Sequence, residues 1–103
     1  KEVKSAAITK TWSGDTDAHP LVAAVTGKKI VVVGFFFTNN STNSMTIKRG
    51  TTAVTGPMTT TANAWIKGNY NPDGHFSTAA SEALNIVPGG NAIIGGWINY
   101  YEE

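Results

Sequence analysis

The chain has 103 residues, a formal net charge of +1 and no cysteine. That length suits one domain with a modest core, and the small net charge argues against a surface that holds nucleic acid or an anionic membrane. The lack of cysteine excludes disulfides, thiolate nucleophiles and thiolate metal sites.

The proportion of charged residues is low. Only 15% of the residues are charged, whereas about 25% is usual in soluble domains. Small monomers normally cover their surface with Lys and Glu, so this composition favours a protein that is packed into an assembly. The sequence shows no secretion signal and no apolar run near the ~20 residues that span a bilayer. We therefore expect a soluble chain made in the cytoplasm.

The first 25 residues predict strands separated by a turn. Residues 1–12 alternate weakly between polar and apolar side chains, which indicates an opening strand. Residues 13–17 form a turn cluster, and residues 21–25 are either a short strand or a buried loop. Within the opening segment, residues 1–10 are expected to be an edge strand or a terminal arm.

Residues 30–37 give the strongest structural signal in the chain. They are mainly β-branched and aromatic, and turn-forming residues follow them, as is typical of a strand. Strict alternation would place Val31, Val33, Phe35 and Phe37 on one face and Ile30, Val32, Gly34 and Phe36 on the other. Both faces are apolar, so we expect a central strand that is covered on both sides, by a second sheet or by another subunit.

The segment that follows predicts a hairpin and an edge. The polar residues 39–44 are expected to connect the central strand to an antiparallel neighbour at residues 45–49. Gly56-Pro57 interrupts the Thr-rich segment 51–61, which is therefore predicted to be an edge strand, a bulge or a strand-loop-strand.

The last third of the chain predicts a loop and two further strands. Residues 68–74 are rich in Asn, Gly and Pro and indicate an exposed loop. The Ala-rich segment 77–84 favours a single helical turn over an extended chain. Strands are expected at residues 85–87 and 92–101, and the second of these alternates cleanly.

Together these elements predict an all-β fold for a single domain, 1–103. We expect an antiparallel β-sandwich, jelly-roll-like, with seven or eight short strands. No internal repeat or linker is present.

Patterns for catalysis and metal binding are sparse. The only imidazoles are His19 and His75, whereas a zinc site needs three or four ligands. Asp15 and Asp17 near His19 are better explained as members of a solvated turn, and no Gly-x-Ser-x-Gly motif occurs. We predict no enzyme, no metal and no cofactor; an enzyme based on a metal or a hydroxyl would need activity sensitive to His75→Ala.

The aromatic residues are better functional candidates. Trp12 and Trp97 can fill the core, contact a protein partner or stack on sugar rings. Tyr70 lies in the predicted loop and is the most credible exposed contact. Trp65 and Tyr70 together would serve a carbohydrate-binding module or a tail receptor-binding module.

Several segments resemble small virion proteins of tailed bacteriophages. The similarity covers about residues 30–101 and lies in Ile30–Phe35, Met45–Gly50, Val54–Met58, Gly74–Ile86 and Gly95–Tyr100. It is a pattern of spacing and residue type without a catalytic motif. The resemblance implies a β-sandwich that serves as a structural part of the particle.

The resemblance implies a capsid decoration (cement) protein on the outer surface of the virion. No nucleic-acid or membrane partner is expected, because the net charge is small. Its expected partners are the major capsid protein or other virion proteins, together with further copies of itself, a trimer being favoured. The predicted interface residues come from the N-terminal arm, the two polar loops and the aromatic set: Lys1, Val3, Ile8, Trp12, Asn39, Asn40, Asn43, Trp65, Tyr70 and Phe76.

Overall fold

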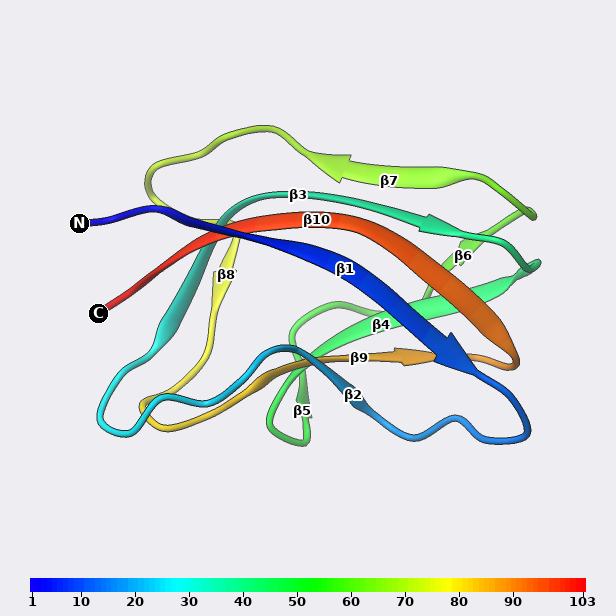
Figure 1. Cartoon of the computed structure of the whole chain (residues 1–103), viewed down its shortest axis with the longest axis horizontal. Coiled ribbons are helices and arrows are strands. Elements are labelled where there is room, and N and C mark those ends of the chain that lie inside the picture. Colours follow the sequence, from blue (N-terminus) through cyan, green and yellow to red (C-terminus); the bar gives the residue numbers. More distant parts are fainter.

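The computed structural model describes all residues 1–103 and contains strands but no helix (Figure 1). The strands are β1 (Lys4–Trp12), β2 (His19–Val22), β3 (Ile30–Asn39), β4 (Asn43–Arg49), β5 (Thr52–Ala53), β6 (Met58–Thr60), β7 (Trp65–Gly68), β8 (Phe76–Ser77), β9 (Leu84–Pro88) and β10 (Ala92–Glu102). The prediction of an all-β fold is confirmed.

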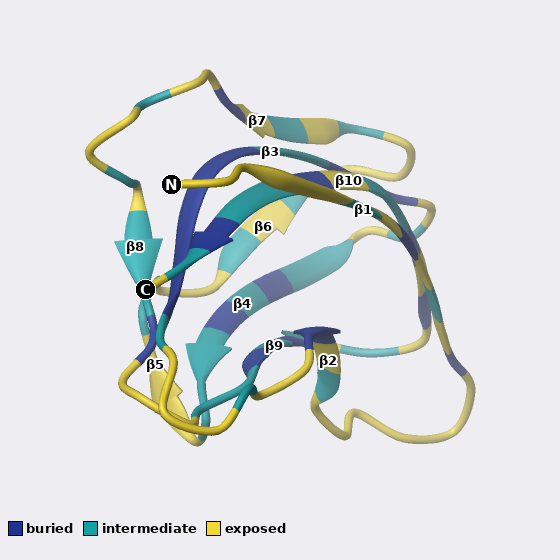
Figure 2. Ribbon diagram, turned by 60° about the vertical axis from the view of Figure 1, so that its left-hand side comes forward, coloured by how far each residue is buried: buried dark blue, intermediate teal, exposed yellow.

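Two five-stranded antiparallel sheets form the sandwich. Sheet A has the order β1-β10-β3-β7, with β8 also paired to β3. Sheet B has the order β2-β9-β4-β5, with β6 also paired to β4. The sheets lie face to face (Figure 2), which confirms the predicted β-sandwich.

The core lies between the two sheets and explains why they pack. One side chain in two along the long strands is apolar and faces inward, so the strands alternate between buried and exposed positions. The most deeply buried side chains of sheet A are Ile8, Trp12, Ile30, Val32, Phe37, Ile94 and Ile98. Those of sheet B are Met45, Ile47, Leu84 and Ile86.

Strand β3 is central in sheet A, as predicted, but its side chains do not alternate strictly. Against β10, Gly34 is opposite Asn99 and Val32 is opposite Tyr100, so Val33 is an extra residue. This β-bulge shifts the alternation by one position.

The bulge corrects the predicted faces of the central strand. Phe35 and Phe37 join Ile30 and Val32 on the core side instead of lying with Val31 and Val33. Val31 and Val33 pack with Tyr101 in a separate small cluster on the outer side, where the loop before β8 also approaches them. Both faces of β3 are covered at this end of the strand.

The predicted hairpin between the central strand and residues 45–49 is wrong. Strand β3 belongs to sheet A and β4 to sheet B, so the connection crosses from one layer to the other. The crossing lets Met45 and Ile47 cover the core from the opposite side. A short polar loop predicts a hairpin only when both strands bury their apolar face in the same sheet.

Asn39 organises this crossing and is completely buried. Its side-chain Nδ2 donates to Asn43 Oδ1 at 2.7 Å, and its Oδ1 accepts from the Ser41 amide at 2.9 Å. Its carbonyl oxygen accepts from the Asn63 amide at 2.7 Å. A buried amide side chain with these partners is satisfied, because the loop supplies the hydrogen bonds that water would otherwise make.

Two other predictions can be compared directly with the structure. Residues 77–84 form no helical turn: β8 ends at Ser77, and a turn with Ser81 at φ 63° leads to β9. Pairing of β8 with β3, and of β9 with β2 and β4, holds the flanking residues extended, which outweighs the weak preference of alanine for helix. The Thr-rich segment does form short strands, β5 and β6, with Gly56-Pro57 between them.

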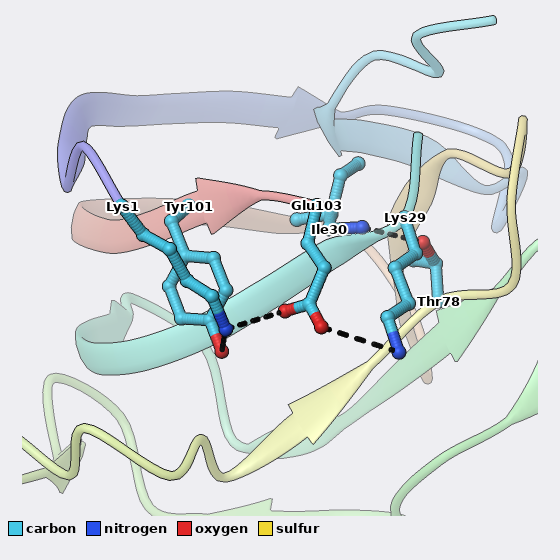
Figure 3. A network of polar contacts seen from close by, with 6 residues as sticks. All are labelled: Lys1, Lys29, Ile30, Thr78, Tyr101 and Glu103. Atoms are coloured by element: carbon cyan, nitrogen blue, oxygen red, sulfur yellow. Dashed lines mark hydrogen bonds and ion pairs between the residues drawn. The ribbon is translucent and has the colours of Figure 1, made fainter. Parts of the chain in front are cut away.

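The two ends of the chain meet at one end of the sandwich (Figures 1 and 3). The Glu103 carboxylate accepts from Lys1 Nζ at 3.0 Å and lies 3.8 Å from Lys29 Nζ. Lys1 Nζ also lies 4.6 Å from the centre of the Tyr101 ring. The hydrogen bond between Lys1 and Glu103 raises the pKa of Lys1 and lowers the pKa of Glu103.

The lowered pKa of Glu103 predicts that its ion pair with Lys1 is lost in acid. Its contribution to stability is present at neutral pH and is lost as the pH falls through the lowered pKa. An NMR titration of the Glu103 carboxyl should give a midpoint below the ordinary value for glutamate, and Lys1→Ala should move it upward. Equal midpoints in the two proteins would contradict the ion pair.

Glycine at position 96 is predicted to be essential for the pairing of β10 with β3. Its φ is +140°, and a Cβ there would collide with the carbonyl oxygen of Phe36. Gly96→Ala should therefore lower the free energy of unfolding by about 2–4 kcal/mol in urea denaturation.

The neighbouring glycine provides the matched control. A Cβ at Gly95 would lie at ordinary contact distance, 3.6 Å, from Thr38 Oγ1. Gly95→Ala should be clearly less destabilising than Gly96→Ala, and similar losses from both would contradict this explanation.

Candidate interaction surface

The outer face of sheet A carries aromatic side chains from three adjacent strands. The register places Trp97 of β10 opposite Phe36 of β3, and Thr38 of β3 opposite Trp65 of β7. Odd-numbered residues of β10 point outward because Ile94 and Ile98 face the core. The shift at the bulge puts Phe36 on the same outer face as Trp97.

The three rings form one row across the sheet. The Phe36 ring centre lies 5.7 Å from that of Trp65 and 6.3 Å from that of Trp97, and the ring planes differ by 24° and 15°. These separations are typical of offset-stacked aromatic pairs. We refer to Trp65, Phe36 and Trp97 as the aromatic row.

The aromatic row is open to solvent. Trp65 is 58% exposed and Trp97 is 42% exposed, and Phe36 between them is half-buried. The row's neighbours across the sheet are small or uncharged: Ala7 lies opposite Trp97, and Thr9 and Thr38 lie on either side of Gly95. No large side chain therefore shields this outer face of sheet A from solvent.

The only charged side chain beside the row is a lysine. Lys67 Nζ lies 5.9 Å from the centre of the Trp65 ring, within the range of a cation–π contact. Lys67 takes part in none of the three ion pairs in the molecule. No acidic residue occurs on the outer side of β1, β10, β3 or β7 across the row.

The structure places some of the predicted interface residues at the surface. Trp65 and Tyr70 are well exposed, and Val3 is 46% exposed. Lys1 and Asn40 are also exposed, but Lys1 is engaged with Glu103, and Asn40 Oδ1 accepts from the Ile93 amide at 2.6 Å.

Three of the predicted interface residues lie in the interior, which corrects the prediction for them. Ile8 and Trp12 are core residues of β1, and Asn39 is the buried residue of the crossing loop. Trp12 stacks on His19 with ring centres 4.3 Å apart and donates from Nε1 to Asp17 O. The side chains of these residues are not available to a partner in this fold.

The remaining predicted residues are half-buried and engaged within the chain. Asn43 bonds to Asn39 and to the Asn91 carbonyl, and Phe76 packs against the core. The predicted set is thus dispersed over the molecule, and of its members only Trp65 belongs to the aromatic row.

The predicted interface set contains neither Phe36 nor Trp97, although Trp97 was considered both as a core residue and as a contact to a partner. The alternation of residues 92–101 already put Trp97 on the face opposite Ile94 and Ile98, which was a usable signal. For Phe36 no such signal existed, because its neighbours depend on the pairing of β3 with β7 and β10.

The rest of the molecule lacks the features of a metal site or a cavity. No group of three His, Cys, Asp or Glu side chains is placed to hold a metal ion, and no pocket was found. There is also no helix of the length and apolar character needed to cross a membrane. Comparisons with known protein families, curated proteins and solved structures gave no match.

The exposed position of Trp65 predicts that its removal spares the fold. Trp65→Ala should change the free energy of unfolding by less than about 1 kcal/mol, whereas Trp12→Ala should cost about 3–5 kcal/mol. The physical reason is that Trp12 is only 2% exposed, so removal of its side chain would leave a cavity in the core. Equal losses in urea denaturation would show that the aromatic row is structural.

Proposed function

We propose that this chain is a structural protein of a bacteriophage virion, most specifically a capsid decoration (cement) protein on the outer surface of the head. It acts by protein contacts, without catalysis, and needs no metal, cofactor, nucleic acid or membrane. Its partners are the major capsid protein or other virion proteins, and further copies of itself.

The aromatic row is the observation that carries this proposal. Trp and other aromatic side chains contribute most to the binding energy of protein interfaces when neighbouring contacts exclude water from them. Here two tryptophans and a phenylalanine stand on a sheet rather than on a mobile loop. Their positions are therefore fixed before binding, which lowers the entropic cost of association.

The uncharged surroundings of the row also support a protein partner. Interface centres are depleted in charged residues, because the charges would have to lose their water on binding. Across the row only Lys67 is charged, and it stands on β7, at the edge of the sheet.

The strand order supports the jelly-roll-like architecture that the resemblance implies. The chain passes from sheet A to sheet B and back as it runs through β1, β2, β3 and β4. Sheet A, in the order β1-β10-β3-β7, faces sheet B, in the order β2-β9-β4-β5. In sheet A the first strand, β1, lies beside the last strand, β10. Double-sheet wrapping of this kind is common in viral capsid domains.

The proposed mechanism is stabilisation by mass action. A protein that binds the assembled head lattice, but not its ruptured form, shifts the equilibrium toward the intact shell in proportion to its binding free energy. A rigid β-sandwich suits this role because it transmits force between neighbouring capsomers without unfolding locally.

A carbohydrate-binding or tail receptor-binding module is the alternative function. The same aromatic row favours it, because exposed Trp rings also stack on the apolar faces of sugars. Tyr70 is 64% exposed and is available as a further contact in the adjoining loop.

The position of the chain in an intact particle tests the proposal. Cryo-electron microscopy of particles that contain it should show it on the outer capsid, with Trp65, Phe36 and Trp97 against the lattice. Re-binding to particles depleted of the chain should weaken at least tenfold for Trp65→Ala combined with Trp97→Ala, as expected for two interface anchors at ~1–2 kcal/mol each.

Thr59→Ala on β6 is the matched control, since Thr59 is exposed on the opposite sheet. This variant should re-bind like the natural chain. Location on a tail fibre, or glycan-array binding that Trp65→Ala abolishes, would replace the cement function with the alternative. Undiminished re-binding of the double variant would exclude the aromatic row as the contact.

A further inference from the structure

Lys67 is the only charged side chain beside the aromatic row, and the chain gives it no anionic partner. It lies opposite Phe36 in the pairing of β7 with β3, and it points to the same side of β7 as Trp65. Ile66 between them packs against the core, so Trp65 and Lys67 both point outward. All three ion pairs of the molecule use the glutamates at the end of the chain and do not include Lys67.

A surface that covers the aromatic row also covers Lys67. The lysine and Phe36 occupy opposed positions on neighbouring strands, which places their Cβ atoms about 5 Å apart. The ammonium group lies 5.9 Å from the centre of the Trp65 ring. A contact that excludes water from these two rings therefore removes water from the lysine as well. An ammonium group that loses water without gaining a counter-charge is strongly unfavourable.

The two exposed tryptophans add a second requirement. Trp12 donates its indole N–H to Asp17 O, whereas the indole N–H groups of Trp65 and Trp97 form no hydrogen bond within the chain. These two donors are satisfied by water at the surface, and each needs an acceptor from the partner once it is covered. The row thus brings one cationic and two neutral donors to a contact, and no acidic side chain.

A second copy of the chain does not meet these requirements on this face. Two copies placed face to face would bring two Lys67 ammonium groups into the contact and no carboxylate, because no acidic residue lies across the row on β1, β10, β3 or β7. Like charges in one interface are unfavourable. The face is therefore suited to a different chain.

A nucleic acid is also a poor match. It carries a charge on every nucleotide and binds to stripes of Lys and Arg. Here a single cation stands beside an uncharged face, and the net charge of the chain is only +1. A protein surface, in contrast, can offer one carboxylate next to apolar side chains.

We propose that the aromatic row binds a surface of another protein on which an Asp or Glu carboxylate pairs with Lys67, beside an apolar patch that covers the three rings. This inference rests on the proposed cement function and specifies its partner: in the particle, the surface belongs to the head lattice. The charge stands at the β7 end of the row, whereas Ala7 and Thr9 at the β1 end are uncharged. The carboxylate therefore fixes the orientation in which the chain binds.

Charge variants of Lys67 test the pairing by re-binding to particles depleted of the chain. Lys67→Glu should weaken re-binding about tenfold or more, because it brings two carboxylates together. Lys67→Arg keeps the charge and should re-bind far better than Lys67→Glu. Lys67 is exposed, so both variants should unfold in urea like the natural chain.

Lys48→Glu is the matched control. Lys48 lies on the outer side of β4 in sheet B, because Met45 and Ile47 face the core, and it takes part in no ion pair. This variant makes the same charge change on the opposite face of the sandwich and should re-bind like the natural chain. Equal weakening by Lys48→Glu and Lys67→Glu would be a general effect of charge and would overturn the proposal.

Zero-length cross-linking identifies the carboxylate directly. A carbodiimide joins a lysine amine to a carboxylate in contact with it as an amide, and takes up the water that is lost. In particles that contain the chain, mass spectrometry should find Lys67 joined to an Asp or Glu of another protein. Particles that carry the Lys67→Arg variant should lack this cross-link and keep those of the other lysines, because a guanidinium does not form the amide.

Three results would overturn the proposal: Lys67→Glu that re-binds like the natural chain, a Lys67 cross-link only to a second copy of this chain, or binding to an acidic glycan that Lys67→Glu abolishes. The double variant of Trp65→Ala and Trp97→Ala separates this failure from failure of the proposed function. If only the double variant loses re-binding, the aromatic row is the contact and the carboxylate alone is refuted. Undiminished re-binding of both would refute the row as well.

Discussion

The fold depends on how β3 pairs with its neighbours, because this strand lies at the middle of sheet A and contributes to both of its faces. One extra residue, Val33, changes the alternation. It turns Phe35 and Phe37 toward the core and leaves Phe36 outside, between Trp97 and Trp65. The core and the candidate interaction surface are therefore set by the same irregularity.

The two sides of sheet A have different physical roles. The inner side gains stability by removing branched aliphatic and aromatic side chains from water. The outer side leaves two tryptophans exposed, which has no benefit for the isolated chain. Exposed aromatic side chains on a rigid sheet are consistent with the proposed contact surface, and the scarcity of charge around them agrees with that proposal.

Much of the architecture was predictable from local residue patterns. The strands at the beginning, middle and end of the chain, the edge character of the Thr-rich segment and the loop at residues 68–74 all followed from alternation and turn chemistry. The strand with which each strand pairs was harder to predict from the sequence. Residues 45–49 were assigned to the wrong neighbour, because a short polar loop does not show which sheet the next strand joins. Of the three residues of the aromatic row, the predicted interface set contained only Trp65, and Trp97 was considered as either a core or a contact residue.

The sequence by itself determined that the chain is an all-β sandwich with a weakly charged surface, because hydrophobic period, turn residues and composition are local properties. Only the tertiary structure decided which apolar residues meet. Phe36, Trp65 and Trp97 are far apart in the chain and become neighbours through strand pairing across sheet A. The buried positions of Trp12 and Asn39, and the edge position of β1, likewise depend on contacts between distant segments, which no local pattern encodes.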